Sequence, residues 1–171
     1  NTSGIKQREG LVFDILAELL KPRAIIDRTS ESAARMENVA SGAGVVRGES
    51  ALASLQFREL GFDFDLPLSL GQKTGYYLDQ RALRARVERL ASGRSVLDAY
   101  AFVGSFGLAA LRGGATRARI VDQSAIAVEL AAETVRKNGL HERAEIIKMD
   151  AIRAMDDAAN TGTFDLVLCD P

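Results

Sequence analysis

The sequence predicts an α/β protein in which a small α+β region precedes a doubly wound parallel sheet. Two observations predict the sheet. From residue 95 onward, short apolar runs alternate with stretches of helical periodicity, the order typical of strand–helix–strand units. Each apolar run is also closed by an aspartate, and a parallel sheet would gather these acids along one edge. The first 70 residues lack this alternation and mix a helix with short strands.

The first region contains one helix and several short strands. Residues 8–20 are expected to form a helix because their apolar side chains recur every three or four positions. A short strand is expected at residues 24–26 and a loop at residues 41–44. Residues 53–66 indicate two strands around Gly61, because apolar and polar side chains alternate on either side of that glycine.

Strands and helices alternate in the second region. Strands are expected at residues 95–99, 117–121, 144–149 and 164–169. The helix expected at residues 104–111 ends at a pair of glycines, and Ser124 can cap a helix that runs to Asn138. Gly139 suits the position after that helix, where a left-handed backbone is common. A short helix precedes the last strand, and right-handed crossovers then produce a parallel sheet.

Composition excludes several classes of protein. The chain has 171 residues, of which 47% are hydrophobic and 26% charged, so it can form a core. No apolar run approaches the roughly 20 residues of a membrane helix, and a net charge of −1 provides no overall basic field for nucleic acid. One cysteine and one histidine exclude a disulfide framework and a cysteine-cluster zinc site, and we expect no metal.

Both ends of the chain look like cuts. The chain begins at Asn1 rather than at a methionine and has no signal-like segment. It closes on an apolar run that is followed only by Asp170 and Pro171. We therefore expect a fragment of a longer, cytoplasmic protein.

The aspartates at the strand ends are the first candidate site. They are Asp98, Asp122, Asp150 and Asp170. Ligands of doubly wound sheets bind at the carboxyl edge, near the point where the strand order reverses. Aspartate is also a common helix N-cap, so a single one would carry little weight. Four in register, with Gly104 after the first, favour a ligand site.

The turn after the first strand discriminates between ligands. A dinucleotide needs glycines there, but Tyr100 and Phe102 occupy the first glycine places, and only Gly104 and Gly107 remain. A dinucleotide stays the alternative because Asp122 lies near the usual offset of a ribose-binding acid. A ligand with ribose hydroxyls, an adenine and a cationic end but no phosphate fits better. S-adenosylmethionine has these groups.

The chemistry of this ligand assigns roles to the acids. Asp122 would accept hydrogen bonds from the ribose hydroxyls, and such charge-assisted bonds are strong. Asp150, with Ala151, would lie at the adenine edge. Gly104 would let the backbone pass close to the methionine part. Asp98 would orient the turn or meet the amino group.

A more specific signal lies upstream. The string Gly71-Gln72-Lys73-Thr74-Gly75-Tyr76-Tyr77-Leu78-Asp79-Gln80-Arg81 resembles the signature of the ribosomal RNA large subunit methyltransferase I family. The strand-edge residues resemble those of class I S-adenosylmethionine-dependent methyltransferases. Residues 25–31 resemble, more loosely, a stretch of the family's central α+β domain, so the resemblance covers about residues 10–171.

The resemblance implies a fold, a reaction and partners. Residues 1–70 would be part of a central α+β domain, and residues 71–171 would supply the first four strands of a Rossmann-like, seven-stranded methyltransferase sheet. The family's PUA RNA-binding domain would be missing. The full enzyme would methylate C5 of a cytosine in large-subunit ribosomal RNA, and a homodimer of the full-length protein is compatible with the resemblance. Its cysteine nucleophile would follow the fourth strand, beyond Pro171, so the fragment would be inactive alone.

The combined reading defines a candidate cofactor site. Its members are Gln80, Arg81, Asp98, Tyr100, Phe102, Gly104, Asp122, Gln123, Asp150, Ala151 and Asp170. Gln80 and Arg81 would reach the cofactor's carboxylate or the RNA, and Asp170 with Pro171 would line the methyl-transfer site. Cys169 is expected to be a buried strand residue rather than the nucleophile. A NAD-type oxidoreductase and a non-catalytic RNA-binding module are the alternatives.

Overall fold

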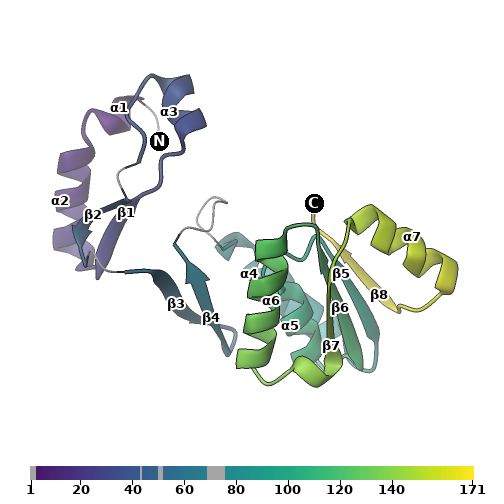
Figure 1. Ribbon diagram of the computed structural model, residues 1–171. Helices are drawn as coiled ribbons and strands as arrows, with labels where there is room; N and C mark the ends of the chain where they lie inside the picture. Colours follow the sequence, from purple (N-terminus) through teal and green to yellow (C-terminus); the bar gives the residue numbers. More distant parts are fainter. Residues whose placement is uncertain (1–2, 43, 50–51, 69–75) are drawn as a thin grey trace. The chain divides into compact units, whose positions relative to one another are not determined.

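A computed structural model describes residues 3–42, 44–49, 52–68 and 76–171 (Figure 1). Packing divides the chain into two units. The first comprises residues 1–54 with 68–73, and the second comprises residues 55–67 with 74–171. No helix within the described ranges has the length and apolar character to cross a membrane.

The first unit is a small α+β structure. Its elements are the helices α1 (Ser3–Lys6), α2 (Glu9–Leu20) and α3 (Glu31–Glu37) and the antiparallel strands β1 (Ala24–Asp27) and β2 (Gly44–Gly48). The expected helix at residues 8–20 and strand at 24–26 are confirmed as α2 and β1. We did not expect α1, α3 or β2, which are short. Gly48 passes so close to Arg23 that an added Cβ would lie 2.2 Å from the Arg23 carbonyl oxygen.

A hairpin opens the second unit. Its strands are β3 (Ser54–Glu59) and β4 (Phe62–Pro67), as expected around Gly61. Phe62, Phe64 and Leu66 are buried, which confirms the alternating pattern. The two residues between the strands, Leu60 and Gly61, have φ of 49° and 84°. Positive φ at both positions defines a type I′ turn, the turn whose twist matches that of a hairpin.

The doubly wound sheet follows. It consists of β5 (Ser95–Ala99), β6 (Arg117–Asp122), β7 (Ala144–Lys148) and β8 (Leu166–Cys169). The order β7-β6-β5-β8 and parallel pairing confirm the predicted sheet. Order reverses at β5, whose Ala99 pairs with Val121 of β6 on one side and with Cys169 of β8 on the other.

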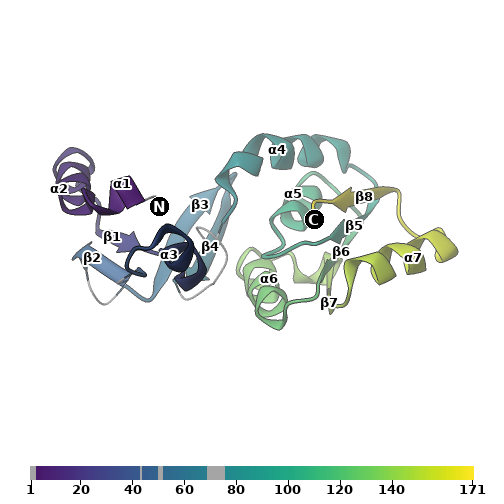
Figure 2. The same ribbon diagram turned by 90° about the horizontal axis from the view of Figure 1, so that it is seen from above.

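Helices cover both faces of this sheet. They are α5 (Ser105–Arg112), α6 (Ala125–Lys137) and α7 (Ala151–Thr161), and α4 (Arg81–Leu90) packs on α5. Short 3-10 turns lie at Leu78–Gln80 and His141–Arg143. Seen from above, α7 lies across the sheet from α5 and α6 (Figure 2). Ala154 and Ala158 of α7 pack on Leu97 and Val121, whereas Ile120 faces α5. The central strand β5 is therefore buried from both sides, which explains its continuous apolar run, whereas β7 and β8 keep exposed positions.

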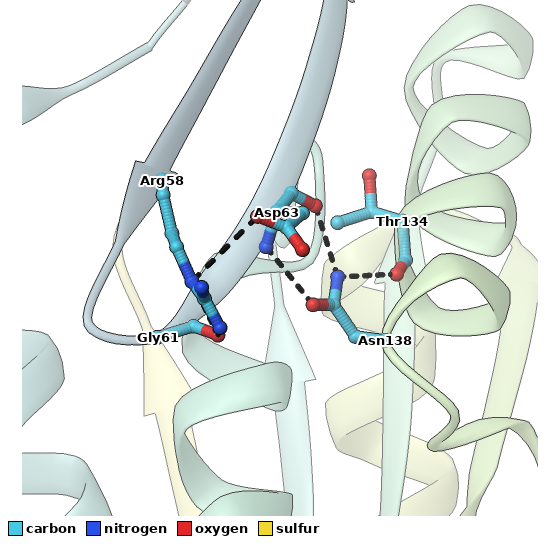
Figure 3. Close-up of polar contacts among 5 residues, drawn as sticks. All are labelled: Arg58, Gly61, Asp63, Thr134 and Asn138. Carbon is cyan, nitrogen blue, oxygen red and sulfur yellow. Dashed lines mark hydrogen bonds and ion pairs between the residues drawn. The ribbon is translucent and has the colours of Figure 1, made fainter.

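Asn138 fastens the hairpin to α6 (Figure 3). It caps the C-terminus of α6, where its amide nitrogen donates to the Thr134 carbonyl oxygen at 2.8 Å. The same nitrogen donates to the Asp63 carbonyl oxygen at 3.0 Å, and the Asn138 side-chain oxygen accepts from the Asp63 amide at 2.9 Å. Gly139, with φ of 69°, and Leu140 complete the expected helix stop by donating to carbonyls of the last turn.

The hairpin therefore packs with the sheet, although the division predicted at residue 70 places it with the first region. The Arg112 guanidinium also lies 4.5 Å from the centre of the Phe62 ring. The two units are defined by their internal contacts and are not domain boundaries, so the division into domains at residue 70 stays a prediction.

Candidate cofactor site

Asp98 joins β5 to the helix that follows it. The side chain is 1% exposed, and its Oδ2 accepts a hydrogen bond from the Gly107 amide at 2.8 Å. That amide lies in the first turn of α5, where helix donors have no intrahelical acceptor. The residue at the N-cap is Gly104, which has no side chain to cap the helix. Asp98 therefore supplies the missing cap from inside the sheet. This contact supports the expectation that Asp98 orients the turn after its strand.

The environment of Asp98 favours its neutral form. Burial and, to a smaller extent, the negative charges of Asp122 and Asp170 raise the pKa of Asp98 to about 7, against the opposing effect of the Gly107 hydrogen bond. Asp122 and Asp170 thus lie close enough to Asp98 for their charges to act on it. This finding supports the expectation that the sheet gathers them at one edge.

The turn between β5 and α5 has an unusual backbone. Tyr100, Phe102 and Gly104 have φ of 62°, 50° and 75°. Left-handed φ is normal for glycine but costs roughly 1–2 kcal/mol for other residues. Tyr100 and Phe102 therefore adopt the backbone of the glycines whose places they occupy, which the sequence did not reveal.

Asp122 lies at the end of β6, next to this turn. Its Oδ2 accepts from the Phe102 amide at 2.9 Å, and its Oδ1 accepts from the Ser124 amide at 2.8 Å. Each carboxylate oxygen can accept a further hydrogen bond. The side chain is half-buried, and the following Gln123 is exposed. A carboxylate in this position can receive hydroxyl donors at the carboxyl edge of the sheet.

Asp150 and Asp170 differ in their surroundings. Asp150 is the N-cap of α7 and accepts from the Arg153 amide at 3.1 Å, so capping accounts for its position. Ala151 beside it is buried. Asp170 and Pro171 follow β8 and are exposed. The roles expected for these four residues stay predictions.

The upstream signature is described from Tyr76 onward, so Gly71 to Gly75 lie outside the described residues. Tyr76 is 5% exposed and packs against Phe57 and Phe64. The ring of Tyr77 meets the ring of Phe102 edge to face, with centroids 6.0 Å apart. The expectation that one tyrosine belongs to the core is confirmed for Tyr76. The contact of Tyr77 with the turn between β5 and α5 was not expected.

A buried ionic cluster around Glu59 was also missed. Glu59 accepts hydrogen bonds from Arg84 at 2.8 Å, from Arg81 at 3.0 Å and from the Tyr76 hydroxyl. Burial raises the pKa of Glu59, but these three donors together hold it below its usual value. The side chains of Glu59 and Arg84 are 3% and 2% exposed, whereas that of Arg81 is 60% exposed. Arg81 is thus held by Glu59 while most of its side chain is open to solvent. Gln80, the residue before it, is half-buried.

Cys169 is exposed, so the expectation that it is buried was wrong. Side chains alternate along β8, and the exposed Val167 shares a face with Cys169. Among the described residues, β8 pairs only with β5, so its other edge is unpaired, and the face that carries Val167 and Cys169 is exposed. No cluster of metal-binding side chains occurs in the described part of the chain.

Comparisons with known proteins agree on a family and a fold. Residues 35–171 match the family described as S-adenosylmethionine-dependent methyltransferase. Ribosomal RNA large subunit methyltransferase I from Aliivibrio fischeri strain MJ11 is 31% identical over 99% of this chain and 43% of its own length. The protein of that name from Shewanella amazonensis is 33% identical over 96% of this chain and 42% of its own. The chain thus spans less than half of these relatives.

Solved structures share the fold. A protein described as a methyltransferase from Streptococcus mutans superimposes with a TM-score of 0.83 at 22% identity, over 99% of this chain and 44% of its own. Another, solved in complex with SAH, has a TM-score of 0.81 at 22% identity, covering 99% and 43%. A protein named aTrm5, solved in complex with a leucine tRNA, has a TM-score of 0.66 at 20% identity, covering 84% of this chain and 41% of its own.

Proposed function

The chain belongs to the S-adenosylmethionine-dependent methyltransferase family, and we propose that it acts on RNA, at C5 of a cytosine in large-subunit ribosomal RNA. The observation that carries this proposal is the 31% identity to a ribosomal RNA large subunit methyltransferase I over 99% of the chain. A structural neighbour binds a tRNA, which is consistent with an RNA substrate. Cytoplasmic location and a homodimer of the longer protein belong to the same proposal.

The carboxyl edge of the sheet fits the cofactor. We assign Asp122 to the ribose hydroxyls because both of its oxygens are fixed by backbone amides and retain accepting capacity. Gly104 would adjoin the methionine part, Asp150 with Ala151 the adenine, and Gln123 the ribose side. These assignments rest on the order of strands and on where each residue follows its strand.

The other residues of the site complete the proposal. Tyr100 and Phe102 would form walls of the first turn, and Gln80 with the anchored Arg81 would approach the cofactor's carboxylate or the RNA. Bound S-adenosylmethionine supplies an electrophilic methyl group. Asp170 and Pro171 would line the place where that methyl meets the base.

Cytosine C5 is a weak nucleophile, so a thiolate must first add to C6 of the ring. Cys169 is the only cysteine of the 171 residues, and it is the last residue of β8. The family resemblance places the nucleophile after the fourth strand, where these residues offer no cysteine. We therefore expect residues 1–171 to bind the cofactor without transferring its methyl group.

Nucleoside analysis tests the proposal. The longest protein that the gene encodes and residues 1–171 would each be incubated with labelled S-adenosylmethionine and unmodified large-subunit ribosomal RNA. We expect 5-methylcytidine with the longer protein only, and unchanged yield after Cys169→Ala. Another methylated nucleoside would contradict the cytosine assignment. Product from residues 1–171, or loss of product in the Cys169→Ala variant, would contradict the assignment of the nucleophile.

A further inference from the structure

We propose that Asp122 is a positioning residue that holds the first turn of the site in its left-handed conformation. This role is separate from the ribose contact assigned above, and only one of its two tests rests on the proposed function. The observation behind it is the bond from the Phe102 amide to Asp122 Oδ2 at 2.9 Å, which links two residues 20 positions apart.

Phe102 needs an external partner to keep its backbone conformation. Its φ of 50° lies in the region that L side chains avoid, and Tyr100 at 62° lies there too. A non-glycine residue persists in such a conformation only where its surroundings impose it. Among the described residues, the Asp122 carboxylate accepts from the Phe102 amide, and the edge of the Tyr77 ring lies at 6.0 Å between centroids. The carboxylate contact is the one that binds the backbone.

Asp122 is itself fixed at a second point. Its other oxygen accepts from the Ser124 amide at 2.8 Å, directly before α6, whose N-cap is Ser124. The Ala101 amide also donates to the Val121 carbonyl at 2.9 Å, so the turn contacts the end of β6 through two adjacent residues. One carboxylate therefore joins the turn after β5 to the start of α6. A bond to a charged acceptor is stronger than one between neutral groups.

The proposal predicts an energetic coupling between residues 102 and 122. With Asp122 present, the turn is forced to positive φ, and a Cβ at position 102 is strained. Without the carboxylate, the turn can relax to negative φ, and the Cβ costs nothing. Phe102→Ala and Phe102→Gly differ only by that Cβ, so comparing them measures the strain without the contribution of the ring.

Thermal unfolding without ligand is the first test. Phe102→Gly should melt roughly 2–4 °C above Phe102→Ala when Asp122 is present. In the Asp122→Ala background this difference should vanish or change sign, because glycine loses more backbone entropy on folding than alanine. In Asp122→Asn, whose amide oxygen can still accept one bond, it should be intermediate. An equal difference in all three backgrounds would overturn the proposal. If Asp122→Ala does not fold, Asp122→Asn provides the comparison.

Affinity for S-adenosylhomocysteine is the second test. When Asp122 is absent, ligand binding must restore the left-handed turn. Glycine at position 102 should then increase the affinity more than when Asp122 is present. The ratio of the Kd of Phe102→Ala to that of Phe102→Gly should be roughly fivefold larger with Asp122→Ala than with Asp122. An unchanged ratio would overturn the positioning role. If no variant binds but the unfolding difference depends on Asp122, the positioning role is supported and the proposed cofactor site is contradicted.

Gly139 provides a matched control. It also has a left-handed φ, 69°, and an added Cβ would meet nothing within 4 Å. Gly139→Ala should lower the melting temperature by the same amount with Asp122 and with Asp122→Ala. A change in this penalty between the two backgrounds would show that Asp122 acts on the whole unit, which would contradict a local role.

Discussion

The Asp98 carboxylate accepts a hydrogen bond from the Gly107 amide at 2.8 Å and thereby caps α5 from within β5. The two residues also share a tight space, because an added Cβ on Gly107 would lie 2.6 Å from Ile120 Cγ1 of β6. Strand, helix and neighbouring strand meet at this point, directly beneath the proposed cofactor turn. Two predictions follow from this pair.

Asp98 should make the protein less stable as the pH rises from about 4 to about 7. Its pKa is about 7 in the folded state, above the usual value of 3.8, so the folded state binds the proton more tightly than the unfolded state. The contribution of Asp98 to stability is therefore fully present when the pH is below its pKa in the unfolded state. It is lost as the pH rises through its pKa in the folded state. Asp98→Asn should remove this loss, on the order of a few kcal/mol, in urea unfolding measured from pH 4 to 8. Identical profiles for the two proteins would contradict the shift.

Gly107→Ala should destabilise the second unit. Alanine is the better helix former, but its methyl group would overlap Ile120 Cγ1 and Cδ1 at 2.6 and 2.7 Å. We expect a net loss of about 1–2 kcal/mol in the free energy of unfolding. Gly10→Ala is the control: that glycine lies in α2 with nothing within 4 Å of an added Cβ, so the change should stabilise by about 0.5–1 kcal/mol. A gain of similar size in both variants would show that the packing is loose.

Leu60→Asn should stabilise the hairpin. Leu60 holds the first central position of the type I′ turn at φ of 49°, where asparagine is much better tolerated. Leu60→Ala removes the same side chain but keeps the strain, so it corrects for lost packing. We expect the asparagine variant to exceed the alanine variant by about 1 kcal/mol in chemical unfolding. Equal stabilities would mean that the turn relaxes without cost.

Glu59→Ala should be strongly destabilising. It would remove the counter-charge of the buried Arg84 guanidinium. The Nε of that guanidinium already has no hydrogen-bond partner among the described residues. Breaking a buried ion pair in this way costs about 3–5 kcal/mol. Glu49→Ala breaks the exposed Arg23–Glu49 pair instead and should cost less than about 1 kcal/mol. Similar effects in the two variants, measured by urea unfolding, would refute the importance of burial.

The central strand β5 could be predicted because it is buried on both faces and must therefore be a continuous apolar run, and β6 is buried along most of its length. The alternation of Phe62, Phe64 and Leu66 likewise revealed a strand with one buried face. The short strand β2 was missed because only Val45, Val46 and Arg47 lie between its glycines, too few to show a period.

The missed features of the site depend on contacts between distant segments. Glu59 is buried only because Tyr76 and Arg84, 17 and 25 positions later, converge on it. The contact between Tyr77 and Phe102 also joins segments that are distant in the sequence. No local sequence pattern indicates either contact. The positive φ of Tyr100 and Phe102 could not be foreseen because aromatic residues seldom adopt it.

The central claim is that the carboxyl edge of the sheet binds S-adenosylmethionine through Asp122. Titration calorimetry of the chain with S-adenosylhomocysteine tests it most directly, alongside Asp122→Ala and, as a control, Asp157→Ala on the exposed face of α7. We predict binding at one site, retained by the Asp157 variant and weakened roughly tenfold or more in the Asp122 variant. Folded protein that does not bind, or an Asp122→Ala variant that binds as tightly as the unmodified chain, would contradict the account.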